Sequence, residues 1–537
     1  MMAVDRDQAR SMVISSGGIV AAESPLAAQD GVRMLEAGGN AIDAAITANA
    51  TMGVVAPMMN GMGGDLFAIV YEAKSGKLYG LNASGWAPKG LTIDFLKGKG
   101  LSEMPNMTVN VVTVPGAVAG WQMLADRFGK KPLSEDLAPA IRTAEGGFPV
   151  PEQTAADWRE AEEWLRKDPG AAATYLVGGH APGLGQVFRN PDLAHSLRLV
   201  AEKGPSGFYR GETAERILAR IKSGGGVMSA DDLSEFSGEW VEPISTTYRG
   251  WTVYEIPPNG QGLGALMMLN IMERFPLRES GFGTAETLHT MIEAKKLAYA
   301  DLRRYIGDPR FSQLPVATLL SKEWAAKRAA LIDPARANSE VPAGELRGGT
   351  DTTYLCAVDR EGNMVSLIQS NFSSFGTGIV APGTGFALQN RGDLFSLDPA
   401  SPNALAGRKR PLHTIIPAFA RKGDLAIAFG IMGGWNQSQA HAQFIADIAD
   451  FGMNIQAALE APRFTKQTFA GNDVQMENRF STAVRSELAA KGHEIRLLGA
   501  FSTNVGGGQA VERNFATCVN FGASDPRKDG AAVPESP

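Results

Sequence analysis

Cysteine is almost absent from this sequence, in which Cys356 and Cys518 are the only two among 537 residues. Two cysteines exclude a disulfide-stabilised scaffold and a cysteine-rich zinc or iron–sulfur site, and they are compatible with a reducing compartment. Histidine is also scarce. Five of the six histidines show no metal-ligand spacing: His180, His195, His289, His441 and His493. We therefore expect neither a metal nor an organic cofactor.

An excess of positive charge is lacking as well. Lys and Arg number 51 against 57 Asp and Glu, for a net charge of −6, which argues against nucleic acid or anionic lipid as a partner. No apolar run reaches the ~20 residues of a membrane span, and the charged N-terminus lacks the apolar core of a secretory signal. We expect a cytoplasmic protein that acts on a small-molecule substrate and has no membrane partner.

The pattern along the chain changes from helices to strands. Ser24 and Pro25 predict the start of one helix, and Asn40 predicts the cap of the next. Residues 110–345 are mostly helical by pattern, whereas strand-like segments dominate from 352 onward. The tail, 523–537, has no large apolar residue, so we expect it to be disordered.

The stretch GGTDTTYLCAVDREGN at 348–363 predicts a hairpin whose turn is centred on Glu361. Symmetric pairing about this turn makes Thr352 and Ser370 cross-strand neighbours. The other predicted pairs are Tyr354 with Ile368, Cys356 with Ser366, and Val358 with Met364. Both faces of the hairpin are apolar, which is typical of a sheet covered on both sides.

The threonine that opens this hairpin has chemical potential. A threonine hydroxyl is a weak nucleophile and needs a base, and no histidine lies nearby in the sequence. Its own α-amino group can be that base, provided the bond between Asp351 and Thr352 is cut. Gly348 and Gly349 give the preceding backbone the freedom that such a cut requires. Taken alone, the two threonines are better explained by the ordinary preference of threonine for strands.

Motifs from about Ile19 to Val519 resemble the γ-glutamyltranspeptidase family of N-terminal-nucleophile hydrolases. They include GGNAIDAAITANATMGVVAPMMNGMGGDLF, TVPGAVAGW, PPNGQGLGALMMLNIME, TTYLCAVDREGN, FGTGIV, RPLHTIIPA, GIMGG and FGMNIQAALEAPRF. The resemblance implies an α+β fold, the αββα four-layer sandwich. It also implies one precursor that matures into a helix-rich large subunit, 1–351, and a small catalytic subunit, 352–537, which stay associated as a heterodimer.

The resemblance also implies roles for individual residues. Thr352 corresponds to the catalytic threonine, which self-cleavage after Asp351 would expose. Ser370 corresponds to a second hydroxyl residue that orients the nucleophile. Gly433 and Gly434 correspond to the pair whose backbone N–H groups form the oxyanion hole, in front of a helix that starts at about Trp435 or Asn436.

The groups that would recognise a γ-glutamyl moiety are mostly replaced. Ile93 stands where the family has an arginine, and Phe372 where an asparagine is usual. The position of a conserved acid of the family is Leu394, although Asp393 is adjacent. In QNRGDLF the family's glutamine has become Arg391.

The remaining substrate-binding candidates follow from the same comparison with the family. Asn390 precedes Arg391, and His413 with Thr414 takes the place of a serine pair. Arg391 offers a planar fork for a carboxylate, and His413 offers a second donor. It is equally open that Arg391 pairs with a structural acid such as Asp393 and that His413 is a packing residue.

The sequence therefore predicts an amidohydrolase that forms an acyl-Thr352 intermediate with a small carboxylate-bearing substrate, as in the oxamate amidohydrolase or cephalosporin-acylase-like branches. Phe395–Leu412 is short for a lid loop, which favours hydrolysis over transpeptidation. The alternatives are a genuine γ-glutamyltransferase, acting as a glutathione hydrolase, and a non-catalytic binding homologue that does not self-cleave. GQGLGA at 260–265 imitates a dinucleotide-binding fingerprint but lacks its last glycine and the surrounding parallel-strand repeat.

Overall fold

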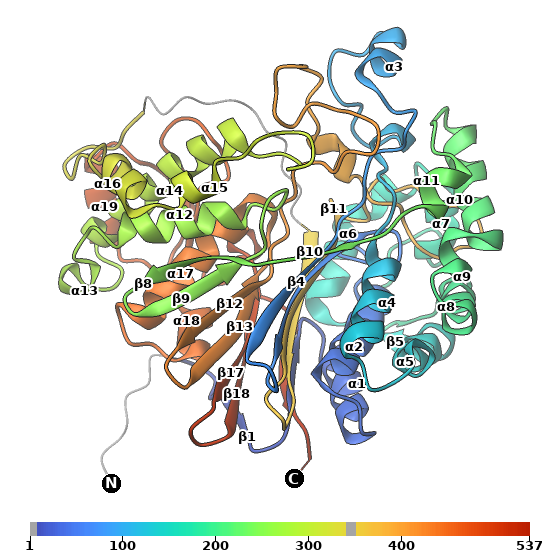
Figure 1. Ribbon diagram of the computed structural model, residues 1–537, viewed down its shortest axis with the longest axis horizontal. Coiled ribbons are helices and arrows are strands. Elements are labelled where there is room, and N and C mark those ends of the chain that lie inside the picture. Colours follow the sequence, from blue (N-terminus) through green and yellow to red (C-terminus); the bar gives the residue numbers. More distant parts are fainter. Residues whose placement is uncertain (1–7, 340–350, 537) are drawn as a thin grey trace.

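The computed structural model describes residues 8–339 and 351–536. Two antiparallel sheets lie face to face, and helices cover the outer face of each (Figure 1). This arrangement is the α+β, four-layer αββα sandwich that the sequence predicts. Gly348 and Gly349 lie outside the described residues, so their expected role stays a prediction.

The first sheet has seven strands, and every neighbouring pair is antiparallel. In spatial order they are β1 (Val13–Ser15), β18 (Val519–Ser524), β17 (Gly508–Asn514), β13 (Leu425–Ile431), β12 (Ala418–Lys422), β9 (Trp251–Glu255) and β8 (Ile244–Tyr248). Because β9 precedes GQGLGA and pairs antiparallel on both sides, this segment lacks the parallel sheet that a dinucleotide-binding motif needs.

The second sheet also has seven antiparallel strands. In order they are β19 (Ala531–Pro534), β2 (Ile19–Ala22), β10 (Asp351–Val358), β11 (Met364–Phe372), β3 (Asp65–Glu72), β4 (Lys77–Ala83) and β7 (Glu239–Val241). The predicted hairpin is β10 and β11, and all its strand residues except Asp351 are buried. Burial on both faces confirms the inference from its apolar sequence.

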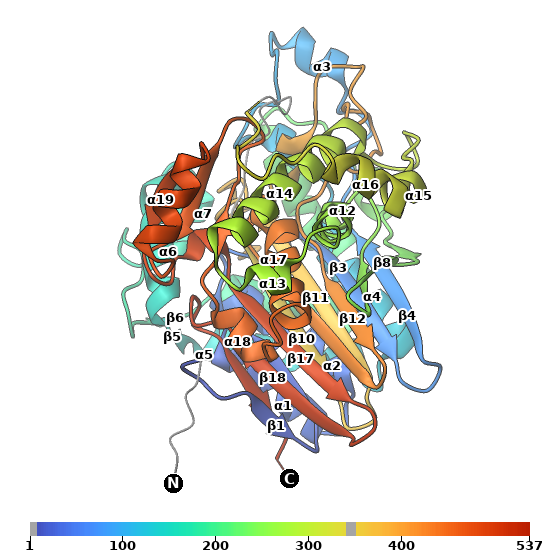
Figure 2. The same ribbon diagram turned by 90° about the vertical axis from the view of Figure 1, so that its left-hand side faces the viewer.

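Helices lie on the outer side of each sheet. On the side of the second sheet are α1 (Pro25–Glu36), α2 (Ala41–Val55), α4 (Ala117–Phe128), α5 (Leu133–Gly146), α6 (Glu152–Leu165), α7 (Pro169–Tyr175), α8 (Pro191–Lys203), α9 (Ser206–Tyr209), α10 (Gly211–Ser223) and α11 (Ala230–Ser234). On the side of the first sheet are α12 (Gly262–Met272), α13 (Leu277–Ser280), α14 (Ala285–Tyr305), α15 (Val316–Leu319), α16 (Lys322–Ala329), α17 (Gln437–Ala449), α18 (Ile455–Glu460) and α19 (Thr482–Ala490) (Figure 2).

Short elements complete the described chain. They are α3 (Ile93–Gly98), β5 (Phe148–Pro149) with β6 (Val187–Phe188), the small sheet β14 (Phe464–Thr465), β15 (Asp473–Glu477) and β16 (Glu494–Leu498), and the 3-10 turns η1 (Val109–Val111), η2 (Arg391–Leu394), η3 (Gly434–Asn436) and η4 (Thr503–Val505). Two of these turns, η2 and η3, hold the candidate site residues at 391, 393 and 434.

Local sequence signals explain the start of the central helix α2. The side chain of Asn40 accepts hydrogen bonds from the amides of Ile42 and Asp43, and the Asp43 carboxylate accepts one from the Asn40 amide. This reciprocal capping box satisfies amides that would otherwise lack partners. Every residue of α2 is buried, so the helix is enclosed between the second sheet and other helices.

The described part of the tail, 523–536, is not disordered, which corrects the expectation from its composition. β18 runs to Ser524, and Ala531–Pro534 form the edge strand β19, which pairs with β2. Backbone hydrogen bonds order this strand, and small side chains such as Ala532 suffice there because a neighbouring strand supplies the pairing. Composition alone carries no information about such pairing.

Residues before and after position 352 contribute to both sheets. β10 lies between β2 and β11, while β11 pairs with β3 on its other side. In the first sheet, β1, β8 and β9 precede this position and the other four strands follow it. The segments 1–351 and 352–537 are therefore parts of one fold, and the expected boundary coincides with the start of a central strand.

Candidate active site

Thr352 lies near the start of β10, where the pairing with β11 is irregular. The register is regular for the predicted pairs Tyr354–Ile368, Cys356–Ser366 and Val358–Met364 and then shifts between Asp351 and Thr353. Despite this bulge, the Thr352 hydroxyl donates a hydrogen bond of 3.2 Å to the Ser370 hydroxyl. The structure thus brings together the two hydroxyl groups that the hairpin pattern places side by side.

The Ser370 hydroxyl is the hub of this site. It donates to the backbone carbonyl of Asp351 at 2.8 Å, and it accepts from the Phe372 amide at 2.7 Å and from Nη2 of Arg391 at 3.1 Å. The same oxygen therefore contacts the hydroxyl of Thr352 and the carbonyl of the bond that precedes it. Ser370 can hold these two groups in a fixed relation.

The two adjacent glycines lie where β13 ends and α17 begins. Gly433 has φ of 122° and Gly434 has φ of 58°, which side chains with a Cβ rarely adopt. The turn η3 occupies residues 434–436, so the expected helix begins one or two residues later than predicted, at Gln437. Within the described residues, neither glycine N–H donates to a protein acceptor. Free, oriented amides at the start of a helix suit a developing oxyanion.

Gln261, from the GQGLGA segment, supports this turn. Its side-chain amide donates to the carbonyl oxygens of Thr414 at 2.5 Å and Gly434 at 2.7 Å. The role of this glycine-rich segment is therefore to join α12 to the turn of the glycine pair.

A cavity of about 370 Å³ reaches both the candidate cleavage point and the glycine turn. Asp351 and Gly433 line it together with Ser373, and further lining residues include Asp157 and Lys528. Asn390 borders this region because its side chain bonds both the amide and the hydroxyl of Ser373 at 3.0 Å. The carbonyl side of the Asp351–Thr352 bond is thus accessible from a polar cavity.

Arg391 is fully buried beside Ser370. Besides its bond to Ser370, the guanidinium donates to the Thr414 hydroxyl at 2.7 Å and lies over the Phe372 ring at 4.3 Å. Within the described residues it has no ion pair with a carboxylate, and its Nε–H has no partner. Burial lowers the pKa of Arg391 to about 9, and the nearby Asp65 partly opposes this. The charge of Arg391 therefore lacks a directly bonded carboxylate within the described chain.

His413 is bound within the protein instead of facing a substrate site. Its Nε2 lies 2.9 Å from Oδ2 of Asp65, and its Nδ1 accepts from the Ile415 amide at 3.4 Å. Burial, with a smaller contribution from Arg391, lowers the pKa of His413 to about 3, so the ring is neutral and Nε2 carries the proton. His413 cannot bind a substrate without breaking these bonds, and its contacts are those of a residue that orients Asp65.

Asp65 is the site residue that sequence reasoning missed. It begins β3 directly opposite Ser370, and its carboxylate also accepts from the Gly85 amide at 2.8 Å and from the Gln389 side chain at 2.7 Å. The signal was an acid at the head of the apolar run DLFAIVY, after two glycines. A Cβ on Gly64 would lie 2.5 Å from the Ser370 carbonyl, so the close approach of this segment to β11 requires glycine.

Asp393 lies apart from the residues gathered around Ser370. It lines a second cavity of about 370 Å³ with Arg303 and Leu394, and this cavity does not include Thr352 or Gly433. Of the substrate-binding candidates, Arg391 contacts Ser370 directly and Thr414 contacts Arg391. Asn390 contacts Ser373, and Asp393 lines the second cavity.

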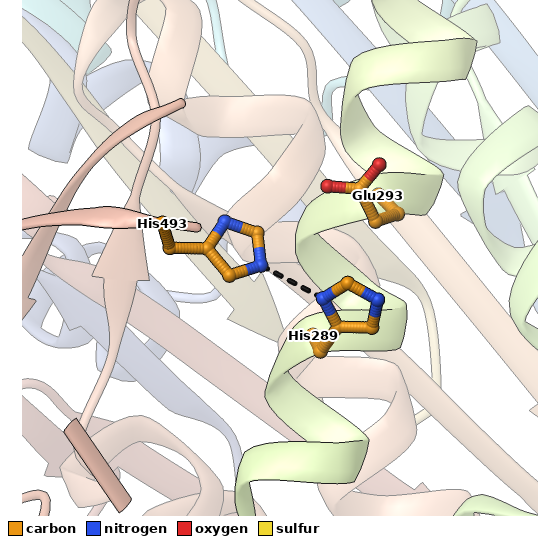
Figure 3. Close-up of side chains that lie close together, drawn as sticks. All are labelled: His289, Glu293 and His493. Carbon is orange, nitrogen blue, oxygen red and sulfur yellow. Dashed lines mark hydrogen bonds between the residues drawn. The ribbon is translucent and has the colours of Figure 1, made fainter. Parts of the chain in front are cut away.

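His289, Glu293 and His493 lie close enough together to suggest a metal site (Figure 3). However, Nε2 of His289 bonds the Asp333 carbonyl at 2.8 Å, so its Nδ1 is free to accept from Nε2 of His493, also at 2.8 Å. Glu293 is occupied by the buried ammonium of Lys296 at 2.6 Å. In these tautomers both histidines are neutral and already hydrogen-bonded, and the neighbouring ammonium of Lys296 repels a metal cation.

None of the helices in the described part of the chain has the length and apolar character needed to cross a membrane.

Comparison with known proteins places this geometry in a family. The sequence model of the gamma-glutamyltranspeptidase family matches residues 27–535. The chain is 37% identical to the glutathione hydrolase-like YwrD proenzyme of Bacillus subtilis, over 97% of this chain and 99% of that protein. It is 36% identical to the oxamate amidohydrolase proenzyme of Klebsiella pneumoniae, with the same coverage. The crystal structure of cephalosporin acylase from Bacillus halodurans superposes with a TM-score of 0.92 at 43% identity, covering 99% of this chain and 98% of that one. The chain therefore belongs to the γ-glutamyltranspeptidase family of N-terminal-nucleophile hydrolases.

Proposed function

We propose that this enzyme cleaves itself between Asp351 and Thr352 and then hydrolyses the amide bond of a small substrate whose acyl group carries a carboxylate. The free α-amine of Thr352 takes the proton of its own hydroxyl, and Oγ1 attacks the substrate carbonyl. Ser370 orients the nucleophile, and the amides of Gly433 and Gly434 stabilise the oxyanion. The protonated α-amine gives its proton to the substrate nitrogen, the C–N bond breaks, and the amine or ammonia leaves. Water then hydrolyses the acyl-Thr352 ester, which releases the acid and restores the hydroxyl.

Self-cleavage is supported by the contacts of Ser370 and by the relatives. One hydroxyl bonds both the Thr352 side chain and the Asp351 carbonyl, which are the two groups that must react. Relatives that match nearly the whole chain are named as proenzymes. Because the segments on either side of residue 352 share both sheets, the two products would remain together as a heterodimer.

The single observation that carries the substrate class is the state of Arg391. A guanidinium with no exposed surface and no carboxylate partner in the described chain is costly to bury, and an anionic ligand removes that cost. It lies next to Ser370 and thus within reach of an acyl group bound to Thr352. The similarity to an oxamate amidohydrolase fits a short carboxylate-bearing acyl group, and the short segment at 395–412 favours water over an amine acceptor.

The test has two parts. Mass spectrometry of the purified protein should find fragments of 351 and 186 residues, the second beginning with Thr352. The processed enzyme is then assayed with oxamate and with oxamide, its neutral counterpart, alongside γ-glutamyl anilide, glutathione and a glutaryl β-lactam. We expect kcat/KM for oxamate to exceed that for oxamide by about 100-fold, since an unpaired buried cation discriminates strongly. A marked preference for the γ-glutamyl compounds would instead make this chain a glutathione hydrolase.

Hydrolysis and transfer can be separated in the same assay. Glycylglycine added as an acceptor should leave the free acid as the main product. A γ-glutamyl or oxalyl dipeptide as the main product would contradict the proposed preference for water.

A further inference from the structure

Lys528 is a buried ammonium group beside the candidate cleavage point. It lies between β18 and β19, its side chain is 4% exposed, and its Nζ lies 3.6 Å from Oδ2 of Asp157 on α6. The stem packs on Gly507, where a Cβ would lie 2.4 Å from Cγ of Lys528. Burial alone would lower the pKa of Lys528, but the carboxylates of Asp157, Glu23 and Asp351 raise it above its usual value. The group is therefore charged.

Glu23 contacts the chain on the downstream side of the bond and interacts electrostatically with Lys528. It follows β2, and its Oε1 accepts a hydrogen bond of 3.2 Å from the amide of Tyr354, two residues after Thr352. Its Oε2 is buried and has no hydrogen-bond partner in the part of the chain described. Burial raises the pKa of Glu23 to about 8, and Lys528 is the main group that opposes this rise.

Asp351 faces the same ammonium from the upstream side. Asp351 lines the same cavity as Asp157 and Lys528, and its backbone carbonyl accepts a hydrogen bond from Ser370. Burial raises the pKa of the Asp351 carboxyl to about 6, and Lys528 lowers it. One cation thus acts on carboxylates on both sides of the Asp351–Thr352 bond.

The other charged groups that face this cluster are few. Glu160 of α6 lies near Asp351, and Asp525 lies near Glu23. Asp525 is ion-paired with Arg463 and Arg527, so its charge is already compensated. Lys528 is the one cation that acts on both Glu23 and Asp351 among the described groups.

We propose that Lys528 is a positioning residue for self-cleavage: its ammonium, paired with Asp157, attracts the Asp351 side chain across the shared cavity so that the Asp351 carbonyl stays on the Ser370 hydroxyl, while Glu23 fixes the strand beyond Thr352. This role rests on the proposed self-cleavage. In that reaction Oγ1 of Thr352 bonds to the Asp351 carbonyl carbon, the C–N bond breaks, and the hydroxyl proton ends on the Thr352 nitrogen. Water then hydrolyses the ester, giving a carboxyl group at Asp351 and restoring the hydroxyl.

The experiment follows cleavage of freshly purified precursor on denaturing gels between pH 5 and 8.5. Wild type should show a rate that rises with pH around a midpoint near 6, where Asp351 ionises. In Lys528→Met the Asp351 pKa rises, so the midpoint should move up by about one unit and the rate at pH 6 should fall about fivefold. Lys528→Arg keeps the charge and should restore the wild-type midpoint.

Two further variants guard against a purely structural effect. Lys296→Met removes another buried lysine that pairs with a carboxylate, Glu293, away from the junction, and it should leave the midpoint unchanged. Asp351→Asn should cleave slowly with no inflection near pH 6. If Lys528→Met does not fold, this variant tests whether ionisation of Asp351 controls cleavage. Folding of each variant is measured by thermal unfolding in the Thr352→Ala background.

The outcomes are distinct. A wild-type chain that stays intact while hydrolysing amides overturns self-cleavage itself and this role with it. A wild type that cleaves, with the same rate and midpoint in Lys528→Met, overturns only the role of Lys528. An inflection near pH 6 that persists in Asp351→Asn also overturns the role of Lys528, because the inflection would then not come from Asp351.

Discussion

The groups proposed to break the amide bond and the groups proposed to recognise the acyl chain are built differently. Thr352, Ser370 and the Gly433–Gly434 turn offer hydroxyl and amide groups without charge, and a hairpin register and a strand-to-helix turn place them. Arg391 and Asp65 are charged and buried. Each is hydrogen-bonded to a side chain from a distant segment, Arg391 to Ser370 and Asp65 to His413.

This difference shows what each part tolerates. Neutral hydroxyl and amide groups placed by backbone geometry can act on any acyl group that reaches them. A buried charge network depends on its whole set of partners, because removing one partner leaves the others unpaired at a cost of several kcal/mol. Specificity in this enzyme should therefore change through the charged region, while loss of all catalysis should arise in the neutral one. Four substitutions test this contrast.

Thr352→Ala should have the largest effect. Without the hydroxyl, neither the backbone carbonyl nor a substrate is attacked, so the chain should stay a single species of 537 residues. Amidase activity should fall by roughly 10⁴-fold or more, as for the loss of other enzymic nucleophiles. Denaturing gels and a substrate assay measure both. Thr352→Ser is the matched control and should still cleave, but more slowly. An active, uncleaved Thr352→Ala chain would show that Thr352 is not the nucleophile.

Arg391→Met should act on specificity more than on catalysis. We expect kcat/KM for oxamate to fall about 100-fold through KM, because a carboxylate would lose its charged partner. Activity with neutral oxamide should change little. Arg391→Lys keeps a charge without the planar fork and should lie between the two. Equal losses for oxamate and oxamide would show that Arg391 serves Ser370 and not the substrate.

The extent to which the sequence predicted these two regions differs for a physical reason. The hairpin register and the start of α2 follow from local patterns, because neighbouring residues determine turns, caps and alternation. The contact between Thr352 and Ser370 followed from that register. The pairing of His413 with Asp65 joins positions 348 residues apart, and no local pattern encodes it. The order of the tail in β19 escaped prediction for the same reason.

Asp65→Asn tests the charged region at the residue that acts electrostatically on Arg391. Asp65 raises the pKa of Arg391, which burial holds at about 9. Arg391 is charged below its pKa, so carboxylate binding should weaken as pH rises through about 9. Removing the Asp65 charge should move that loss to lower pH by about one unit, giving a roughly threefold higher KM for oxamate near pH 8.5. The KM profile between pH 7 and 10 measures this shift.

A matched control for that substitution is Asp301→Asn. Asp301 is a buried acid bonded to Arg328 on the helical layer of the first sheet. It should lower stability without moving the KM profile. A profile that is the same in Asp65→Asn and wild type would separate Asp65 from substrate binding.

His413→Gln should have the smallest effect on activity and a measurable one on stability. Glutamine can still donate to Asp65, so we expect no more than a few-fold change in kcat/KM. Folded His413 stays neutral down to about pH 3, whereas in the unfolded chain it gains a proton below about 6.5. The unfolded state therefore binds more protons between these values, and wild-type stability falls as pH drops through this range. Between pH 7 and 5 the variant should lose about 2 kcal/mol less unfolding free energy than wild type, measured by denaturant titration in the uncleaved Thr352→Ala background. Equal losses would mean that His413 is protonated in the folded protein, and the charged region would then hold a second cation beside Arg391.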